Sequence, residues 1–189
     1  MTLTNQNNFL YPGMVGKNLE FFDYNSEMKF IFNGEVKNTS QLPFTFIQLT
    51  EEEIKKHPEV EEALKEWHPN SKIERLHQFL KCRYGGLDFA PDIENNEFKD
   101  GDYFHCEKRA ICKYNGIICK APKYQGKALS VMDIKLIKLT STALTNEAIA
   151  IDLEIPLGSF HKAKQALYKK LAVQTKQEVA LIAKSLNLI

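Results

Sequence analysis

Residues 145–171 read TNEAIAIDLEIPLGSFHKAKQALYKKL, and this stretch decides how the second half of the chain folds. Its apolar residues recur at helical spacing on both sides of an interruption at Glu154-Ile155-Pro156. Thr145 can cap a short first helix. Pro156 lacks an amide proton and is tolerated only at or before the first turn of the next helix. The pattern therefore predicts two consecutive helices, the second starting near Leu157.

The predicted second helix has two different faces. Phe160, Leu167 and Leu171 lie in one narrow stripe at about 100° per residue, so this stripe must pack inward. The opposite face is polar, rich in hydrogen-bond donors and free of carboxylates, and it carries Gly158, His161, Lys162, Gln165 and Lys169. A surface of this kind suits the major groove of duplex DNA.

Two further helices are predicted around this pair. Leu129, Met132, Leu136 and Leu139 recur at helical spacing, and a capping box precedes them at Ser130 and Asp133. After the central pair, one apolar edge is formed by Val179, Ile182, Ala183 and Leu186. Residues 127–189 are thus expected to form an all-α domain of four helices.

The order and spacing of these residues, without a gap, resemble the LuxR-type helix-turn-helix. The residues that carry the resemblance are Leu129-Ser130, Asp133, Leu136, Leu139, Thr145-Asn146, Ile149-Ala150, Leu153, Ile155, Ser159-Phe160, Leu167, Lys170-Leu171, Val173, Glu178 and Ala183. Gly158-Ser159-Phe160 is also similar to region four of bacterial sigma factors. The resemblance implies a module whose third helix enters the major groove and whose fourth helix commonly supplies a dimer contact.

These considerations assign candidate DNA contacts. The expected contacts to base edges are His161, Lys162 and Gln165. The expected contacts that position the DNA backbone are Thr145, Asn146, Ser159 and Lys169. Ile182 and Leu186 are the candidates for a homodimer contact through the last helix.

Charge separates the two halves of the chain. Residues 120–189 hold 11 lysines against 5 acidic residues, for a net charge of +6. Residues 1–119 hold 14 basic against 19 acidic residues, for a net charge of −5. The positive excess lies on the expected DNA module, where phosphate contacts would make binding salt-dependent.

Length and composition suit one ordinary domain plus a small one, in a chain of 189 residues that is 43% hydrophobic. Pro122 and Gly126 break the periodicity, so we expect domains at 1–121 and 127–189. No apolar run is long enough to span a bilayer, and residues 1–5 lack the features of a secretory signal. A cytoplasmic location away from membranes is the expectation.

The first half predicts a small antiparallel sheet followed by helices, and so an α+β fold. Strands are expected at Leu19–Tyr24, Met28–Phe32 and Glu35–Asn38, with a tight turn at Asn33-Gly34 and the aromatic residues Phe21, Phe22, Phe30 and Phe32 in the core. Helices are expected from a Thr50–Glu53 capping box, from Pro58 to Trp67, and from a Ser71–Glu74 cap to Cys82.

All four cysteines fall in one window: Cys82, Cys106, Cys112 and Cys119. A two-residue hairpin at Asn115-Gly116 would pair Cys112 directly with Cys119, with Cβ atoms roughly 5 Å apart. Both sulfurs could then reach one tetrahedral zinc ion, and Cys106 and Cys82 could complete a four-cysteine site. His105 is an alternative fourth ligand. A structural metal would supply order to residues 83–128, which are rich in turn-formers.

Other interpretations of the cysteines remain open at this point. They could be reduced core thiols, a Cys112–Cys119 disulfide or the ligands of an iron–sulfur cluster. Thiol catalysis by Cys82 or Cys106, with His77 or His105 as base, is a further option. No spacing selects such a pair and no phosphate-binding glycine motif occurs, so we do not expect an enzyme.

The leading functional hypothesis is a sequence-specific DNA-binding transcriptional regulator with a metal site in its acidic N-terminal domain. One alternative is a protein-interaction adaptor, for example for RNA polymerase, that docks through the helical module. Another is a metal or redox sensor in which the cysteine site controls DNA binding.

Overall fold

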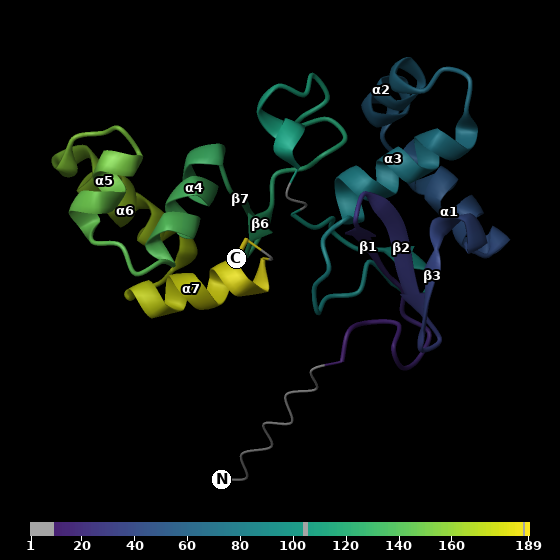
Figure 1. The fold of residues 1–189 in the computed structure, drawn as a ribbon, viewed down its shortest axis with the longest axis horizontal. Helices are drawn as coiled ribbons and strands as arrows, with labels where there is room; N and C mark the ends of the chain where they lie inside the picture. The colour runs from purple at the N-terminus through teal and green to yellow at the C-terminus, as the bar shows by residue number, and fades with distance from the viewer. Residues whose placement is uncertain (1–9, 104–105, 187) are drawn as a thin grey trace, which may run out of the picture. The chain divides into compact units, whose positions relative to one another are not determined.

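The computed structural model describes residues 10–103, 106–186 and 188–189. The chain divides into two compact units, Met1–Cys119 and Lys120–Ile189. The described residues form seven α-helices and three small antiparallel sheets, so the protein is α+β (Figure 1). No helix within the described ranges combines the length and the hydrophobicity needed to cross a bilayer.

The first unit begins with a three-stranded antiparallel meander. Its strands are β1 (Glu20–Tyr24), β2 (Glu27–Phe32) and β3 (Glu35–Asn38), in the order β1-β2-β3. Asn33 and Gly34, between β2 and β3, have φ values of 53° and 78°. Two consecutive positive φ angles define the turn that matches the twist of a tight hairpin. The predicted sheet and its Asn-Gly turn are confirmed.

Three helices follow and pack together beside the sheet: α1 (Phe44–Lys55), α2 (Pro58–Trp67) and α3 (Lys72–Tyr84) (Figure 1). Pro58 starts α2 and the Ser71 hydroxyl oxygen accepts from the Glu74 amide, as predicted. The predicted Thr50 cap is wrong. Thr50 lies in the middle of α1 and its hydroxyl donates to the Phe46 carbonyl at 2.7 Å, because Phe46, Thr50 and Ile54 form the buried face of one longer helix.

The core of this unit lies between the sheet and the helices. Phe21 and Phe30 are almost fully buried, and Phe32 meets Phe46 edge to face with 5.2 Å between ring centroids. Phe22 is also buried, so the expectation that the strand aromatics belong to the core is confirmed.

After α3 the chain forms a short hairpin, β4 (Ile93–Glu94) with β5 (Glu97–Phe98), and a 3-10 helix over Glu107–Ala110. The predicted hairpin at Asn115-Gly116 is wrong. The Ile118 amide donates to the Tyr114 carbonyl at 3.1 Å, which is the spacing of a helical turn. This turn buries Tyr114 and Ile118 together, whereas the predicted hairpin would have placed them on opposite faces.

The second unit starts with a hairpin, β6 (Lys123–Tyr124) and β7 (Lys127–Ala128), where the sequence suggested a linker. Four helices follow: α4 (Val131–Thr140), α5 (Asn146–Asp152), α6 (Leu157–Leu171) and α7 (Lys176–Ser185). The capping box of α4, the Thr145 cap of α5 and the start of α6 are as predicted.

The last helix does not offer the residue pair predicted for a dimer contact. Ile182 is only 6% exposed because α7 packs on α4, and Leu186 is half-buried. Ile182 therefore belongs to the core of its own unit.

Candidate functional site

The outer face of α6 presents the predicted base contacts to solvent. Five of the predicted contact residues are exposed on this helix: Ser159, His161, Lys162, Gln165 and Lys169. On the other side, Phe160, Leu167 and Leu171 are at most 1% exposed and fix the helix to its unit. With 15 residues, α6 is about 22 Å long, which is sufficient to lie in a major groove about 12 Å wide.

The turn between α5 and α6 is defined by backbone hydrogen bonds. Glu154 adopts a left-handed conformation with φ of 56°, and the Ile155 amide donates to the Ala150 carbonyl at 3.1 Å. This pattern is the Schellman termination of a helix, which satisfies carbonyls that would otherwise lack partners. It ends α5 and lets α6 begin at Leu157.

The two predicted contact residues at the start of α5 already have partners within the unit. The Thr145 hydroxyl oxygen accepts from the Ala148 amide at 3.2 Å and caps the helix. The side-chain oxygen Oδ1 of Asn146 accepts from the Lys164 ammonium group at 3.2 Å and links α5 to α6. Thr145 therefore caps α5 and Asn146 joins α5 to α6, whereas the exposed residues of α6 remain available to a partner.

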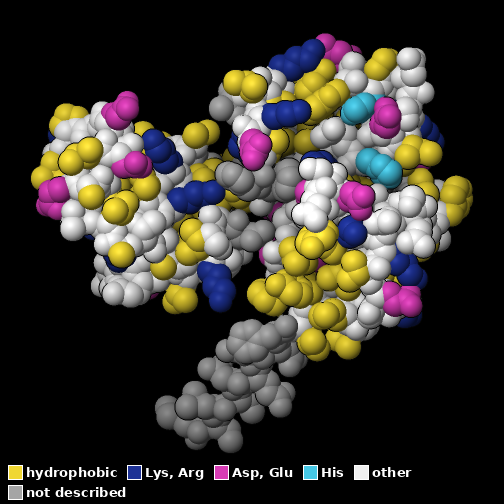
Figure 2. All heavy atoms as spheres, viewed as in Figure 1, with side chains coloured by type: hydrophobic (Ala, Val, Ile, Leu, Met, Phe, Trp, Pro, Cys, Tyr) yellow, Lys and Arg dark blue, Asp and Glu magenta, His cyan; other side chains and the backbone are white. Residues whose placement is uncertain are grey.

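The lysines of α6 have two different environments. Lys170 forms an ion pair of 2.6 Å with Asp133 at the start of α4. Within the described ranges, no carboxylate forms an ion pair with Lys162 or Lys169. Acidic and basic side chains are intermixed on the visible face of each unit in Figure 2. The helix α6 differs from these surfaces because its own sequence contains no acidic residue.

A second candidate site is the cavity lined by the cysteines of the first unit. All four of them, Cys82, Cys106, Cys112 and Cys119, line one cavity of about 770 Å³. All four are free thiols. Cys82, in the last turns of α3, and Cys119 are buried, whereas Cys106 and Cys112 are partly exposed.

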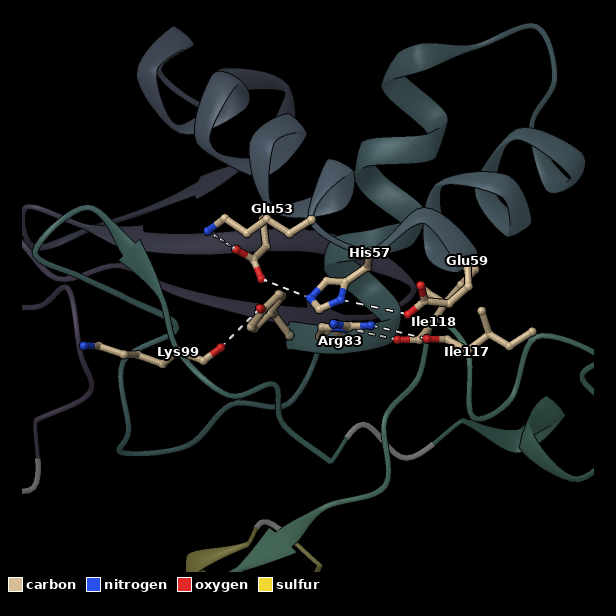
Figure 3. Close-up of polar contacts among 9 residues, drawn as sticks. Glu53, His57, Glu59, Arg83, Lys99, Ile117 and Ile118 are labelled. Carbon is tan, nitrogen blue, oxygen red and sulfur yellow. Dashed lines mark hydrogen bonds and ion pairs between the residues drawn. The ribbon is translucent and has the colours of Figure 1, made fainter. Parts of the chain in front are cut away.

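Arg83 holds the segment before Cys119 against the end of α3. Its guanidinium donates to the carbonyls of Ile118 at 3.1 Å and Ile117 at 3.3 Å, as Figure 3 shows. The residue is only 2% exposed. Because Cys82 precedes Arg83 and Cys119 follows Ile118, these hydrogen bonds bring the two thiols together.

The two buried thiols share a hydrogen bond, and Gln78 also donates to the Cys82 sulfur at 3.0 Å. The hydrogen bond from Cys82, assisted by the charges of Arg109 and Arg83, lowers the pKa of Cys119 to about 7 despite its burial. The same hydrogen bond and burial raise the pKa of Cys82. Cys119 is therefore the thiol of this pair that ionises near neutral pH, and a thiolate is the form that binds metals.

The four cysteines predicted as metal ligands line one cavity, but their sulfur atoms are too far apart to coordinate one ion. Among the described residues, no three cysteine sulfurs lie within 4.8 Å of one another. His105, the alternative ligand and possible base, lies outside the described residues. His77, the other possible base, lines a neighbouring cavity of about 450 Å³ that contains none of the cysteines and shares Gln78 and Lys81 with the cysteine cavity.

Sequence reasoning missed a third group, formed by three carboxylates of the first unit. Glu20, Asp92 and Asp102 place oxygen atoms within 4.8 Å of one another. Burial, together with neighbouring carboxylates, raises the pKa of Glu20 to about 9 and that of Asp102 to about 8. No spacing links positions so far apart in the sequence. The one available signal is Glu20 itself, an acidic residue inside a strand of buried aromatics.

Comparison with protein-family models, curated proteins and solved structures finds no match to this chain.

Proposed function

We propose that the protein is a sequence-specific DNA-binding transcriptional regulator whose α6 enters the major groove. The observation that carries the proposal is the division of α6 into two faces. A fully buried stripe fixes the helix, and the opposite face exposes His161, Lys162 and Gln165 without a carboxylate on the helix. Lysine and glutamine side chains can read purine edges there through hydrogen bonds.

The net charge of +6 on residues 120–189 adds the second element of DNA recognition, attraction to phosphates. Lys169 is the candidate phosphate contact on α6 itself, since Lys170 is engaged with Asp133. Phosphate contacts set the position of a protein on the duplex, whereas base contacts specify the sequence. The arrangement of α6 provides candidates for both.

The test is a selection from random duplex DNA with the full chain, followed by affinity measurements on the enriched sequence. The variant Lys162→Ala/Gln165→Ala should bind more weakly, by about 1–3 kcal/mol for each base-edge interaction that the substitutions remove. The matched control is Gln177→Ala/Lys184→Ala, which removes the same groups from exposed positions of α7. Equal reductions in affinity for both variants would show that charge alone drives binding.

The competing function is docking to an acidic protein surface, such as a subunit of RNA polymerase. It predicts weak, salt-sensitive binding to all DNA and no enriched sequence. An enriched motif that depends on Lys162 and Gln165 excludes this function as the main use of the face.

We also propose that the cysteine cavity binds a structural metal ion, with zinc as the first candidate and an iron–sulfur cluster as the alternative. Support comes from the convergence of all four thiols on one cavity and from the hydrogen bond between Cys82 and Cys119. Cys106 and Cys112 would have to move toward this pair, because structural zinc sites are tetrahedral with sulfur at about 2.3 Å.

Elemental analysis of the purified full chain tests this assignment. Zinc and iron give different metal contents, and a cluster adds visible absorption that zinc lacks. Cys112→Ser should lower the bound metal, and a chelator should unfold the first unit if the metal is structural. If the chelator instead changes DNA affinity while the first unit stays folded, the site is a sensor. Wild-type protein that is purified without a chelator, is folded and contains no metal would contradict the proposal.

A further inference from the structure

The three carboxylates of Glu20, Asp92 and Asp102 come from separate segments of the first unit. Glu20 is the first residue of β1, Asp92 directly precedes β4, and Asp102 follows β5. Glu20 and Asp92 are 0% and 1% exposed, and Asp102 is partly exposed. Carboxylates are almost never buried to this degree without a compensating partner.

The backbone fixes these segments against one another. The Leu19 carbonyl accepts from the amides of both Asp92 and Ile93 at 3.1 Å, and the Leu19 amide donates to the Ile93 carbonyl at 3.0 Å. The Asp102 amide donates to the Arg83 carbonyl at 2.8 Å, at the end of α3. The cluster is therefore part of the folded framework.

Each carboxylate has a buried oxygen without a hydrogen-bond partner. Glu20 accepts from the Asp88 amide through Oε1 at 2.9 Å, but its Oε2 is unpaired. Asp92 accepts from the Phe21 amide through Oδ2 at 2.6 Å, but its Oδ1 is unpaired. Asp102 Oδ2 accepts from no donor group either, and the Asp102 and Asp92 carboxyl groups contact each other, which requires a proton or a cation between them. Thus the fold uses one oxygen each of Glu20 and Asp92 to position the side chain and leaves the other for a different partner.

No basic side chain within the described ranges forms an ion pair with these three carboxylates. The buried guanidinium of Arg83, whose own carbonyl accepts from the Asp102 amide, is directed to the carbonyls of Ile117 and Ile118 instead (Figure 3). A cation would replace the protons that these buried carboxyl groups otherwise hold at neutral pH, and it would bind the unpaired oxygens. Buried charges are stable when they are paired or coordinate a metal.

We propose that Glu20, Asp92 and Asp102 bind a hard divalent cation, for which Ca²⁺ is the best match. Calcium takes oxygen ligands at about 2.3–2.6 Å, so two ligands of one ion can lie up to about 5 Å apart. One oxygen of each of the three carboxylates lies within 4.8 Å of the other two, which agrees with this span. Mg²⁺ requires shorter bonds and a stricter octahedron. Zinc prefers the softer thiolates of the cysteine cavity.

The test uses the full chain after treatment with a chelator and desalting. Calorimetry should detect one Ca²⁺ per chain, and added Ca²⁺ should raise the melting temperature because the ion binds the folded state. Asp102→Asn and Glu20→Gln should each abolish both effects. The matched control is Glu94→Gln, which removes a carboxylate that pairs with Lys99 at 3.2 Å close to the cluster, and its Ca²⁺ response should be that of the wild type.

A second readout does not depend on stability. Tyr84 and Tyr103 lie next to the cluster, so Tb³⁺ bound there should give luminescence on excitation of tyrosine, and Ca²⁺ should compete it away. Lack of a calorimetric, thermal and luminescence response in the folded wild type would overturn the proposal. A response that persists in both amide variants would do the same. The inference is independent of DNA binding, so failure of the DNA selection would leave it intact.

Discussion

Replacing Gly158 with alanine should raise the stability of the second unit and lower its affinity for DNA. Gly158 lies in the first turn of α6, and a Cβ atom built on it meets no atom within 4 Å. Glycine within a helix is less favourable than alanine by about 0.5–1 kcal/mol, mainly because it loses more backbone entropy on folding. For a unit of this size, that gain corresponds to a rise of roughly 2–8 °C in the melting temperature.

The effect on binding should have the opposite sign. Within the protein there is room for a side chain at Gly158. A DNA backbone that passes close to the first turn of α6 would instead require glycine at this position, because a methyl group would collide with it. We expect the affinity to fall by about tenfold, equal to about 1.4 kcal/mol, when the methyl group prevents that approach. Thermal melting and fluorescence anisotropy on the selected duplex measure the two effects separately.

Gln177→Ala on α7 is the control, because it introduces alanine at an exposed helical position away from α6. A stability gain in Gly158→Ala with unchanged DNA affinity would refute the placement of this turn against DNA. A lower stability would refute the inference that the site has open space.

Three other substitutions test the framework. Gly101→Ala should destabilise the first unit by about 1–3 kcal/mol in urea denaturation, because its Cβ would lie 2.6 Å from the Arg83 carbonyl oxygen, and wild-type stability would contradict this packing. Arg83→Met should lower the free energy of unfolding of the first unit by about 2–3 kcal/mol and should lower the metal content, because it removes two charge-assisted hydrogen bonds. Unchanged metal content would show that Arg83 does not support the cysteine site. At Asp133, burial acts to raise the pKa, but hydrogen bonds from Lys170 and Ser130 outweigh it and lower the pKa below the usual 3.8. The ionised form of Asp133 therefore stabilises the fold at pH values above about 3.8, the usual pKa. Asp133→Asn should lower the free energy of unfolding by about 1 kcal/mol at pH 7, and the difference should disappear as the pH falls through the lowered pKa. A difference that persists in acid would refute the electrostatic cause.

Local rules predicted most of the secondary structure. The Asn33-Gly34 turn, the Pro58 start of α2 and the Ser130 and Thr145 caps all depend on residues within a few positions, so the sequence was sufficient to locate them. Thr50 shows the limit of such rules. A threonine three residues before a glutamate can cap a helix, but here α1 begins earlier, at Phe44, because Phe46 is buried on the same face as Thr50.

The candidate sites were harder to predict because they depend on interactions between distant segments. The turn at Asn115-Gly116 follows from the burial of both Tyr114 and Ile118, which the local hairpin rule does not include. Glu20 and Asp102 are brought together only by tertiary structure. The two-faced pattern of α6 is the exception, since a single helix carries both its buried and its exposed residues.

The last turn of α3 connects the two candidate metal sites of the first unit. Cys82 lines the cysteine cavity, the Arg83 side chain holds the segment before Cys119, and the Arg83 carbonyl accepts from the Asp102 amide. A change in this turn therefore reaches both sites through direct hydrogen bonds. The coupling between two ligands must be reciprocal if it exists. Ca²⁺ binding that is unchanged in Cys112→Ser would show that the carboxylate cluster is independent of metal at the cysteines, whereas matched changes in both affinities would identify the end of α3 as the element that links them.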